Sequence, residues 1–213
     1  MSELTAIDIL LNPDETALAH AKAANAKLRE NFPDGFELDA QHVPHITTLQ
    51  RYVRTADLDE VFAAVEQVIR SRDASKLELR AVAYGHLPIA AVPGVGVAAM
   101  VIAPTPELLE LQAALIDAVA PYTESGGAAA AYVTTPQEPD INQDTLHYIE
   151  RYVPDHSGSN YIGHVTVGIA KLDFLTALEA EPFDEFAFHP AGCAVFKLGN
   201  NGTARHELKA WEL

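Results

Sequence analysis

The order of helical and extended segments along the chain restricts its fold more than any other feature. Residues 1–92 run as strand, helix, extended segment, helix and strand, and residues 93–213 begin that order again without obvious sequence repetition. Each sheet and each helix must bury an apolar face, so we expect the helices to back the sheets. The predicted class is α+β: one bilobal domain of mainly antiparallel sheet, with lobes built roughly from these two halves.

Capping residues and apolar spacing define the helices. Asn12, Pro13 and Glu15 predict a helix start with Asn12 as the N-cap and Glu15 completing a capping box. Thr55 is the expected cap of the second helix, and residues 200–202 are the expected turn of the last hairpin, because Asn and Gly tolerate positive φ. The second helix carries an apolar face at helical spacing: Leu58, Val61, Phe62, Val65, Val68 and Ile69.

Residues 121–163 are the least regular part of the chain. They contain Gly126, Gly127, an alanine run and the stretch 136–140 with two prolines. This composition over this length is typical of long surface loops. We therefore interpret residues 121–163 as an insertion with long loops in the second lobe.

Charge and hydropathy exclude several classes of function. Of the 213 residues, 14 are Lys or Arg and 30 are Asp or Glu, which gives a formal net charge of −16. This charge repels polyanions, so we do not expect long nucleic acid as a partner. A local cluster of basic groups could still bind a small nucleotide, because salt screens the global field beyond ~8 Å. No apolar run reaches the ~18–20 residues of a membrane helix, so we expect no membrane association.

The N-terminus and the cysteine content bear on localisation. Glu3 and Asp8 interrupt the apolar N-terminal stretch, so we expect no secretory signal. The single cysteine, Cys193, cannot form an internal disulfide, which agrees with a reducing compartment. We therefore expect a cytoplasmic protein, and we take it to be a monomer.

Two extended segments carry the same His-x-Thr spacing, with His45 and Thr47 in the first half and His164 and Thr166 in the second. In an extended chain, residues two apart point to the same face, so each segment offers an imidazole and a hydroxyl side by side. Chance alone gives about one His-x-Ser or His-x-Thr spacing in a chain of this composition. The interpretation therefore depends on context. Both copies lie in apolar extended segments, and these segments occupy corresponding places in the two halves of the chain.

This pair of motifs resembles those of the two-histidine (2H) phosphoesterase superfamily, which includes the 2′-5′ RNA ligase-like proteins and cyclic nucleotide phosphodiesterases. The element order and the closing hairpin near Trp211 extend the resemblance over most of the chain. The resemblance implies two pseudo-symmetric lobes around a central cleft, with one motif from each lobe. It also implies that His45, Thr47, His164 and Thr166 form the catalytic set, and that no metal or other cofactor is needed.

The substrates that the resemblance implies are small: 2′,3′-cyclic nucleotides, ADP-ribose cyclic phosphate, 2′-5′ linked nucleotides or RNA-end phosphates. An imidazole is neutral or charged near neutral pH, so one ring could accept a proton from water while the other donates to the leaving oxygen. The threonine hydroxyls could bind the non-bridging phosphate oxygens. Which histidine is the acid depends on which ester bond breaks, so both assignments stay open.

Three further residues are candidates for substrate binding. Arg51 is in phase with His45 and Thr47, so it could reach a phosphate, or it could form a surface salt bridge. Tyr161 could stack on a base or fill the core. His42, three residues before its motif, occupies the position that matches Tyr161.

Two other functions are alternatives. A protein on this scaffold could bind a nucleotide without turnover. His42 and His45 could also bind zinc together with His164 or a carboxylate, as in a metallohydrolase. Pro44 argues against a metal site, because it favours an extended stretch in which residues three apart diverge.

Overall fold

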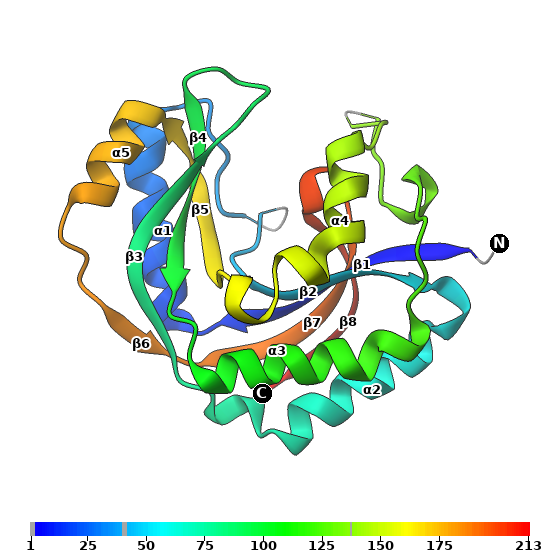
Figure 1. The fold of residues 1–213 in the computed structure, drawn as a ribbon. Helices are drawn as coiled ribbons and strands as arrows, with labels where there is room; N and C mark the ends of the chain where they lie inside the picture. The colour runs from blue at the N-terminus through cyan, green and yellow to red at the C-terminus, as the bar shows by residue number, and fades with distance from the viewer. Residues whose placement is uncertain (1–2, 40–41, 137) are drawn as a thin grey trace.

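The computed structural model describes residues 3–39, 42–136 and 138–213, which form two four-stranded antiparallel sheets with helices packed against them (Figure 1). The first sheet has the order β2-β1-β7-β8 and the second the order β5-β4-β3-β6. The strands are β1 (Leu4–Pro13), β2 (Ile46–Arg54), β3 (Leu79–Pro88), β4 (Val95–Ile102), β5 (His164–Lys171), β6 (Phe186–Phe188), β7 (Pro190–Leu198) and β8 (Ala204–Glu212). The predicted α+β class with two lobes is confirmed.

The two sheets do not divide the chain at residue 92, which corrects the predicted lobe boundary. β3 lies in the second sheet with β4, β5 and β6, whereas β7 and β8 return to the first sheet beside β1. The short connection after β3 folds it into an antiparallel hairpin with β4, so β3 joins the second sheet. The lobes are therefore interleaved along the chain.

The α-helices of the described chain are α1 (Glu15–Asn31), α2 (Leu58–Ser71), α3 (Pro106–Val119), α4 (Gln143–Asp155) and α5 (Leu172–Ala180). α1 and α5 pack against the second sheet, α2 and α3 pack on one another, and α3 and α4 both contact β2 (Figure 1). Single-turn 3₁₀ helices lie in the connections, at Thr55–Asp57, Ala74–Lys76, Ala120–Tyr122, Ala129–Ala131, Gly158–Asn160 and Asn200–Gly202. Because α1 follows a strand of the first sheet and covers the second, it ties the lobes together.

The contact between α1 and β5 is close and specific. The amide of Asn25 donates hydrogen bonds to the carbonyl oxygens of Val167 (2.9 Å) and Phe36 (3.0 Å). Gly168 on β5 has a φ of +148°, and a Cβ there would lie 3.0 Å from Cδ1 of Leu28 on α1. A glycine is therefore needed at residue 168, both for its backbone angle and for the approach of the helix.

Helix starts differ from the prediction, whereas the helix face agrees with it. Asp14, not Asn12, is the N-cap of α1, because β1 stays paired with β7 as far as Pro13. Thr55 begins a 3₁₀ turn, and α2 itself begins at Leu58. On the predicted apolar face of α2, four residues are buried: Val61, Val65, Val68 and Ile69. Strand pairing thus shifts the start of α1 from the predicted residue, whereas the buried face of α2 is the one that the sequence predicted.

Residues 121–163 are not a loose insertion, although their connections are irregular as predicted. They include α4, and Tyr152 of that helix belongs to the main core. They also build a second apolar cluster on the first sheet: Ala6, Tyr52, Ala131, Tyr132, Ile141, Ile149 and Leu198. Residue 137 lies outside the described residues. The segment is therefore an integral part of the first lobe rather than an addition to the second.

Replacing Ile149 with alanine tests whether this segment is structural. The Ile149 side chain is 2% exposed, so Ile149→Ala should lower the free energy of unfolding by about 2–5 kcal/mol, measured by urea denaturation. The matched control is Leu87→Ala, because Leu87 is 70% exposed and its truncation should change stability by less than about 0.5 kcal/mol. If the two substitutions lower stability equally, residues 121–163 are not a structural part of the first lobe.

Candidate active site

The two His-x-Thr motifs lie on neighbouring edge strands. β2 is the outer strand of the first sheet, β5 is the outer strand of the second, and the two contact one another. The hydroxyl of Tyr161, just before β5, donates a hydrogen bond of 2.8 Å to the carbonyl oxygen of Thr47 on β2. This bond joins the approach to one motif directly to the other motif. The two motif strands thus lie together at the junction of the two sheets.

Both imidazoles are held in the same way. Nδ1 of His45 lies 2.7 Å from the carbonyl oxygen of Val43, and Nδ1 of His164 lies 2.9 Å from that of Ile162. A carbonyl oxygen only accepts hydrogen bonds, so Nδ1 carries the hydrogen in each ring. Nε2 of each neutral ring is therefore left as a proton acceptor, and Nε2 of each charged ring as a donor.

A β-bulge follows each motif at the same position. In β2 the extra residue is Thr48, directly after Thr47, and in β5 it is Val167, directly after Thr166. Bulges of this kind bend an edge strand and redirect the side chains beyond them. The duplication that the sequence predicted therefore extends to the backbone of both motifs.

The bulge at Thr48 removes Arg51 from the face that carries Thr47, so the predicted phase of Arg51 is wrong. Arg51 pairs with Ile7, whose side chain lies in the main core, whereas Gln50 pairs with Asp8. Directly paired residues share a face, so Gln50 takes the place expected for Arg51. Arg51 is half-buried, and this burial lowers its pKa.

A buried carboxylate lies against the first motif. The Asp8 side chain is 0% exposed, and its Oδ2 accepts hydrogen bonds from Oγ1 of Thr47 (3.0 Å) and Nε2 of Gln50 (2.8 Å). Nε2 of His45 lies 3.9 Å from the same oxygen. Burial raises the pKa of Asp8, while the charge of His45 and the two hydrogen bonds oppose that shift. Asp8 and Gln50 were not predicted from the sequence; a lone carboxylate inside the apolar stretch 4–13 was the available signal.

The two imidazoles interact electrostatically. Loss of hydration lowers the pKa of His164, and the positive charges of His45 and His156 lower it further, against the effect of the Ile162 carbonyl. Both rings still reach solvent, since His164 is exposed and the His45 side chain is 25% exposed. The rings are therefore accessible and close enough for one to influence the charge of the other.

Two predicted substrate-binding residues have other roles in the structure. Tyr161 is 5% exposed and its hydroxyl is bound to Thr47, so its ring is not available to stack on a base. His42 stacks on Phe36 with 4.5 Å between ring centroids, and its Nδ1 lies 3.2 Å from Oδ1 of Asp39. Nowhere in 3–39, 42–136 and 138–213 do three His, Cys, Asp or Glu side chains gather as a metal site requires. The proposed zinc ligands therefore do not converge.

The helix α4 adds aromatic side chains that no sequence pattern singled out. Tyr148 is 37% exposed, and its ring centroid lies 4.8 Å from that of His156. Burial of the hydroxyl and the negative charge of Asp8 raise the pKa of Tyr148 to about 12, and His156 acts on His164. Tyr148 and His156 therefore lie beside the groups of both motifs.

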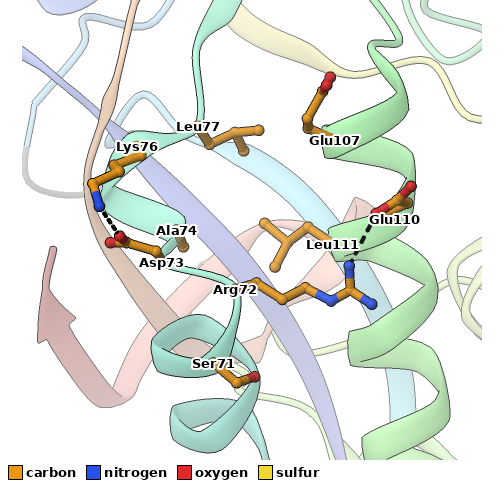
Figure 2. Close-up of a pocket in the computed structure, with 9 residues that line it drawn as sticks. All are labelled: Ser71, Arg72, Asp73, Ala74, Lys76, Leu77, Glu107, Glu110 and Leu111. Carbon is orange, nitrogen blue, oxygen red and sulfur yellow. Dashed lines mark hydrogen bonds and ion pairs between the residues drawn. The ribbon is translucent and has the colours of Figure 1, made fainter.

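A separate hollow of about 600 Å³ lies between the end of α2 and α3 (Figure 2). Its cations are already paired: Nη1 of Arg72 lies 3.2 Å from Oε2 of Glu110, and Lys76 pairs with Asp73. None of the motif residues lines this hollow. It is therefore not part of the histidine site.

The chain was compared with solved structures of other proteins. The crystal structure of TT0787 of Thermus thermophilus matches with a TM-score of 0.56 and 17% identity, covering 98% of each chain. Crystal structures of E. coli LigT complexed with 3′-AMP and with ATP give TM-scores of 0.46 and 0.45, at 12% and 13% identity, over at least 99% of each chain. No family model and no curated protein sequence matches the chain. The likeness to TT0787 establishes a common fold over nearly the whole length.

None of the helices in the described ranges has the length and apolar character needed to cross a membrane.

The lowered pKa of His164 predicts how stability depends on pH. Folding disfavours the protonated form of the His164 ring. The neutral ring therefore contributes its full stability above the ordinary pKa of about 6.5, and this stability is lost as pH falls through the pKa of His164 in the folded protein. We expect His164→Gln to lose less stability than wild type between pH 7.5 and pH 5, measured by urea denaturation. His206→Gln, at an exposed residue of β8, is the control and should behave like wild type. Equal pH dependence in all three proteins would refute the prediction.

Proposed function

We propose that the protein is a phosphodiesterase of the two-histidine kind that hydrolyses a small phosphate ester. The substrates are a 2′,3′-cyclic nucleotide, an ADP-ribose cyclic phosphate or a 2′-5′ linked nucleotide, and His45, Thr47, His164 and Thr166 form the active site. The observation that carries this proposal is the shared orientation of two interacting imidazoles, each with Nδ1 bound to a carbonyl and Nε2 left for proton transfer. The fold shared with TT0787 is consistent with it.

Two interacting imidazoles suit acid–base hydrolysis. A positive charge on one ring disfavours a positive charge on the other, so the two rings resist being protonated at the same time. The neutral ring removes a proton from water, and the charged ring donates its proton to the leaving oxygen. One phosphate between the two Nε2 atoms would allow both transfers in one turnover.

The two threonines differ in their readiness to bind phosphate. In the part of the chain that the structure describes, the hydroxyl of Thr166 has no hydrogen-bond partner, so its hydrogen is free for a non-bridging oxygen. The hydroxyl of Thr47 donates to Asp8. We therefore assign the first phosphate contact to Thr166.

Turnover of a substrate panel tests the proposal. We expect wild type to hydrolyse at least one 2′,3′-cyclic nucleotide, ADP-ribose cyclic phosphate or 2′-5′ dinucleotide in EDTA, with a bell-shaped pH profile. His45→Ala and His164→Ala should each lower kcat by about 10²- to 10⁴-fold, because each removes a proton-transfer group. His206→Ala is the control.

Two outcomes would count against hydrolysis. Stabilisation by 2′,3′-cyclic AMP in a thermal-shift assay without any product would favour a nucleotide-binding protein. Loss of turnover in EDTA, with metal found in the purified protein, would favour a metallohydrolase.

The exposed ring of Tyr148 supports a substrate with a planar base. A stacked base contributes about 1–3 kcal/mol, so Tyr148→Ala should raise KM for a cyclic nucleotide roughly 5- to 150-fold, with little change in kcat. Tyr148→Phe keeps the ring and should retain the wild-type KM. If Tyr148→Ala leaves KM unchanged, the base does not stack on this residue.

A further inference from the structure

The carboxylate of Asp8 makes the two histidines unequal. Its Oδ2 lies 3.9 Å from Nε2 of His45. The charged groups that act on His164 are instead His45 and His156, both of which oppose a further positive charge. The two motifs are alike in their β-bulges and in the Nδ1 contacts of their imidazoles, so this carboxylate is the chemical difference between them.

Stability does not explain a carboxylate at residue 8. The side chain is fully buried in the middle of β1, and Oδ1 has no hydrogen-bond partner within the described residues. Burial of a charge and of an unsatisfied oxygen both disfavour folding. A group that lowers stability beside a site is expected where it serves function.

The other titratable groups facing Asp8 do not neutralise it. They are Tyr148 and Tyr152 on α4, Tyr161 before β5 and Cys193 on β7. Burial raises the pKa of each group, and the charge of Asp8 raises it further. With raised pKa values, these hydroxyls and the thiol are uncharged at neutral pH. Among the described residues, His45 is therefore the cation that faces Asp8.

We propose that Asp8 is a positioning residue that stabilises His45 in its protonated form, which makes His45 the general acid and His164 the general base. This inference rests on the proposed function. The separation of 3.9 Å is too long for a hydrogen bond, so the charge is stabilised through space. The hydrogen on Nε2 of His45 therefore stays available to the substrate.

The proton transfers follow from this assignment. Nε2 of His164 takes a proton from water as the water oxygen bonds to phosphorus. The bond between phosphorus and the leaving sugar oxygen breaks, and that oxygen receives the proton from Nε2 of His45. One water is consumed and a phosphomonoester is formed. Exchange with solvent then returns a proton to His45, favoured by the charge of Asp8, and removes one from His164.

The substitution Asp8→Asn tests the proposal, because it removes the charge and keeps the shape. At pH 8 we expect kcat to fall about 10- to 100-fold with little change in KM, and the difference to narrow toward pH 6 as His45 regains its proton. The basic limb of the pH–rate profile should move about one unit to lower pH. Asp117→Asn, the same change at an exposed residue of α3, is the matched control and should leave the profile unmoved.

Stability separates this role from a purely structural one. The raised pKa of Asp8 means that ionisation opposes folding above the ordinary value of about 3.8, so Asp8→Asn should be more stable than wild type at pH 7, with the gain disappearing as pH falls below that value. If Asp8 only anchored Thr47 and Gln50, the variant would be less stable and the basic limb would not move. That result would overturn the proposal.

Ring titrations by NMR keep the test independent of turnover. In wild type, His45 should keep its proton to a higher pH than His164, and in Asp8→Asn the titration midpoint of His45 should move to lower pH. The reverse order in wild type, or an unmoved His45 midpoint, would overturn the role of Asp8 even if the enzyme is active. Absence of turnover with the expected titrations would instead reject the proposed function alone. If Asp8→Asn fails to fold, the order in which His45 and His164 lose their protons in wild type tests the role of Asp8.

Discussion

The contact between the edge strands of the two sheets is the constraint on which the site depends. β2 and β5 belong to different sheets, yet they lie together, and the hydroxyl of Tyr161 bonds to the carbonyl of Thr47 across the junction. α1 strengthens this arrangement, because it follows β1 and packs on β5, where Asn25 binds the backbone of Val167. Without this contact between β2 and β5, the two motifs would not lie close together.

The edge position also explains the local geometry of the motifs. An edge strand has a free side, so it can accept the bulges at Thr48 and Val167 without disrupting a second neighbour. Each bulge changes the alternation beyond its threonine, and in β2 it places Gln50 beside Asp8 instead of Arg51. The same bulge thus occurs twice, and among the described residues a buried carboxylate lies against the first copy alone.

The segment 121–163 is a structural part of the first lobe. Its glycines and prolines suggested loops, and its connections are irregular, but Ile149 and Tyr132 are buried in a cluster on the first sheet. The apolar residues Leu146, Ile149 and Tyr152 of α4 recur at helical spacing, but the surrounding glycines and prolines outweighed this signal in the sequence. The aromatic residue Tyr148 beside the histidines belongs to this segment.

The sequence alone determined the class of fold, the buried face of α2, the turn at 200–202 with its positive φ angles, and the two His-x-Thr segments. These features depend on the local spacing of apolar residues and on the backbone preferences of single residues, both of which can be read from neighbouring positions in the sequence. Only the tertiary structure decided which strands share a sheet, where the bulges lie, and that Asp8 faces His45 while Arg51 does not. Those features depend on pairing between residues far apart in the chain, and a shift of one residue in that pairing exchanges one face of a strand for the other.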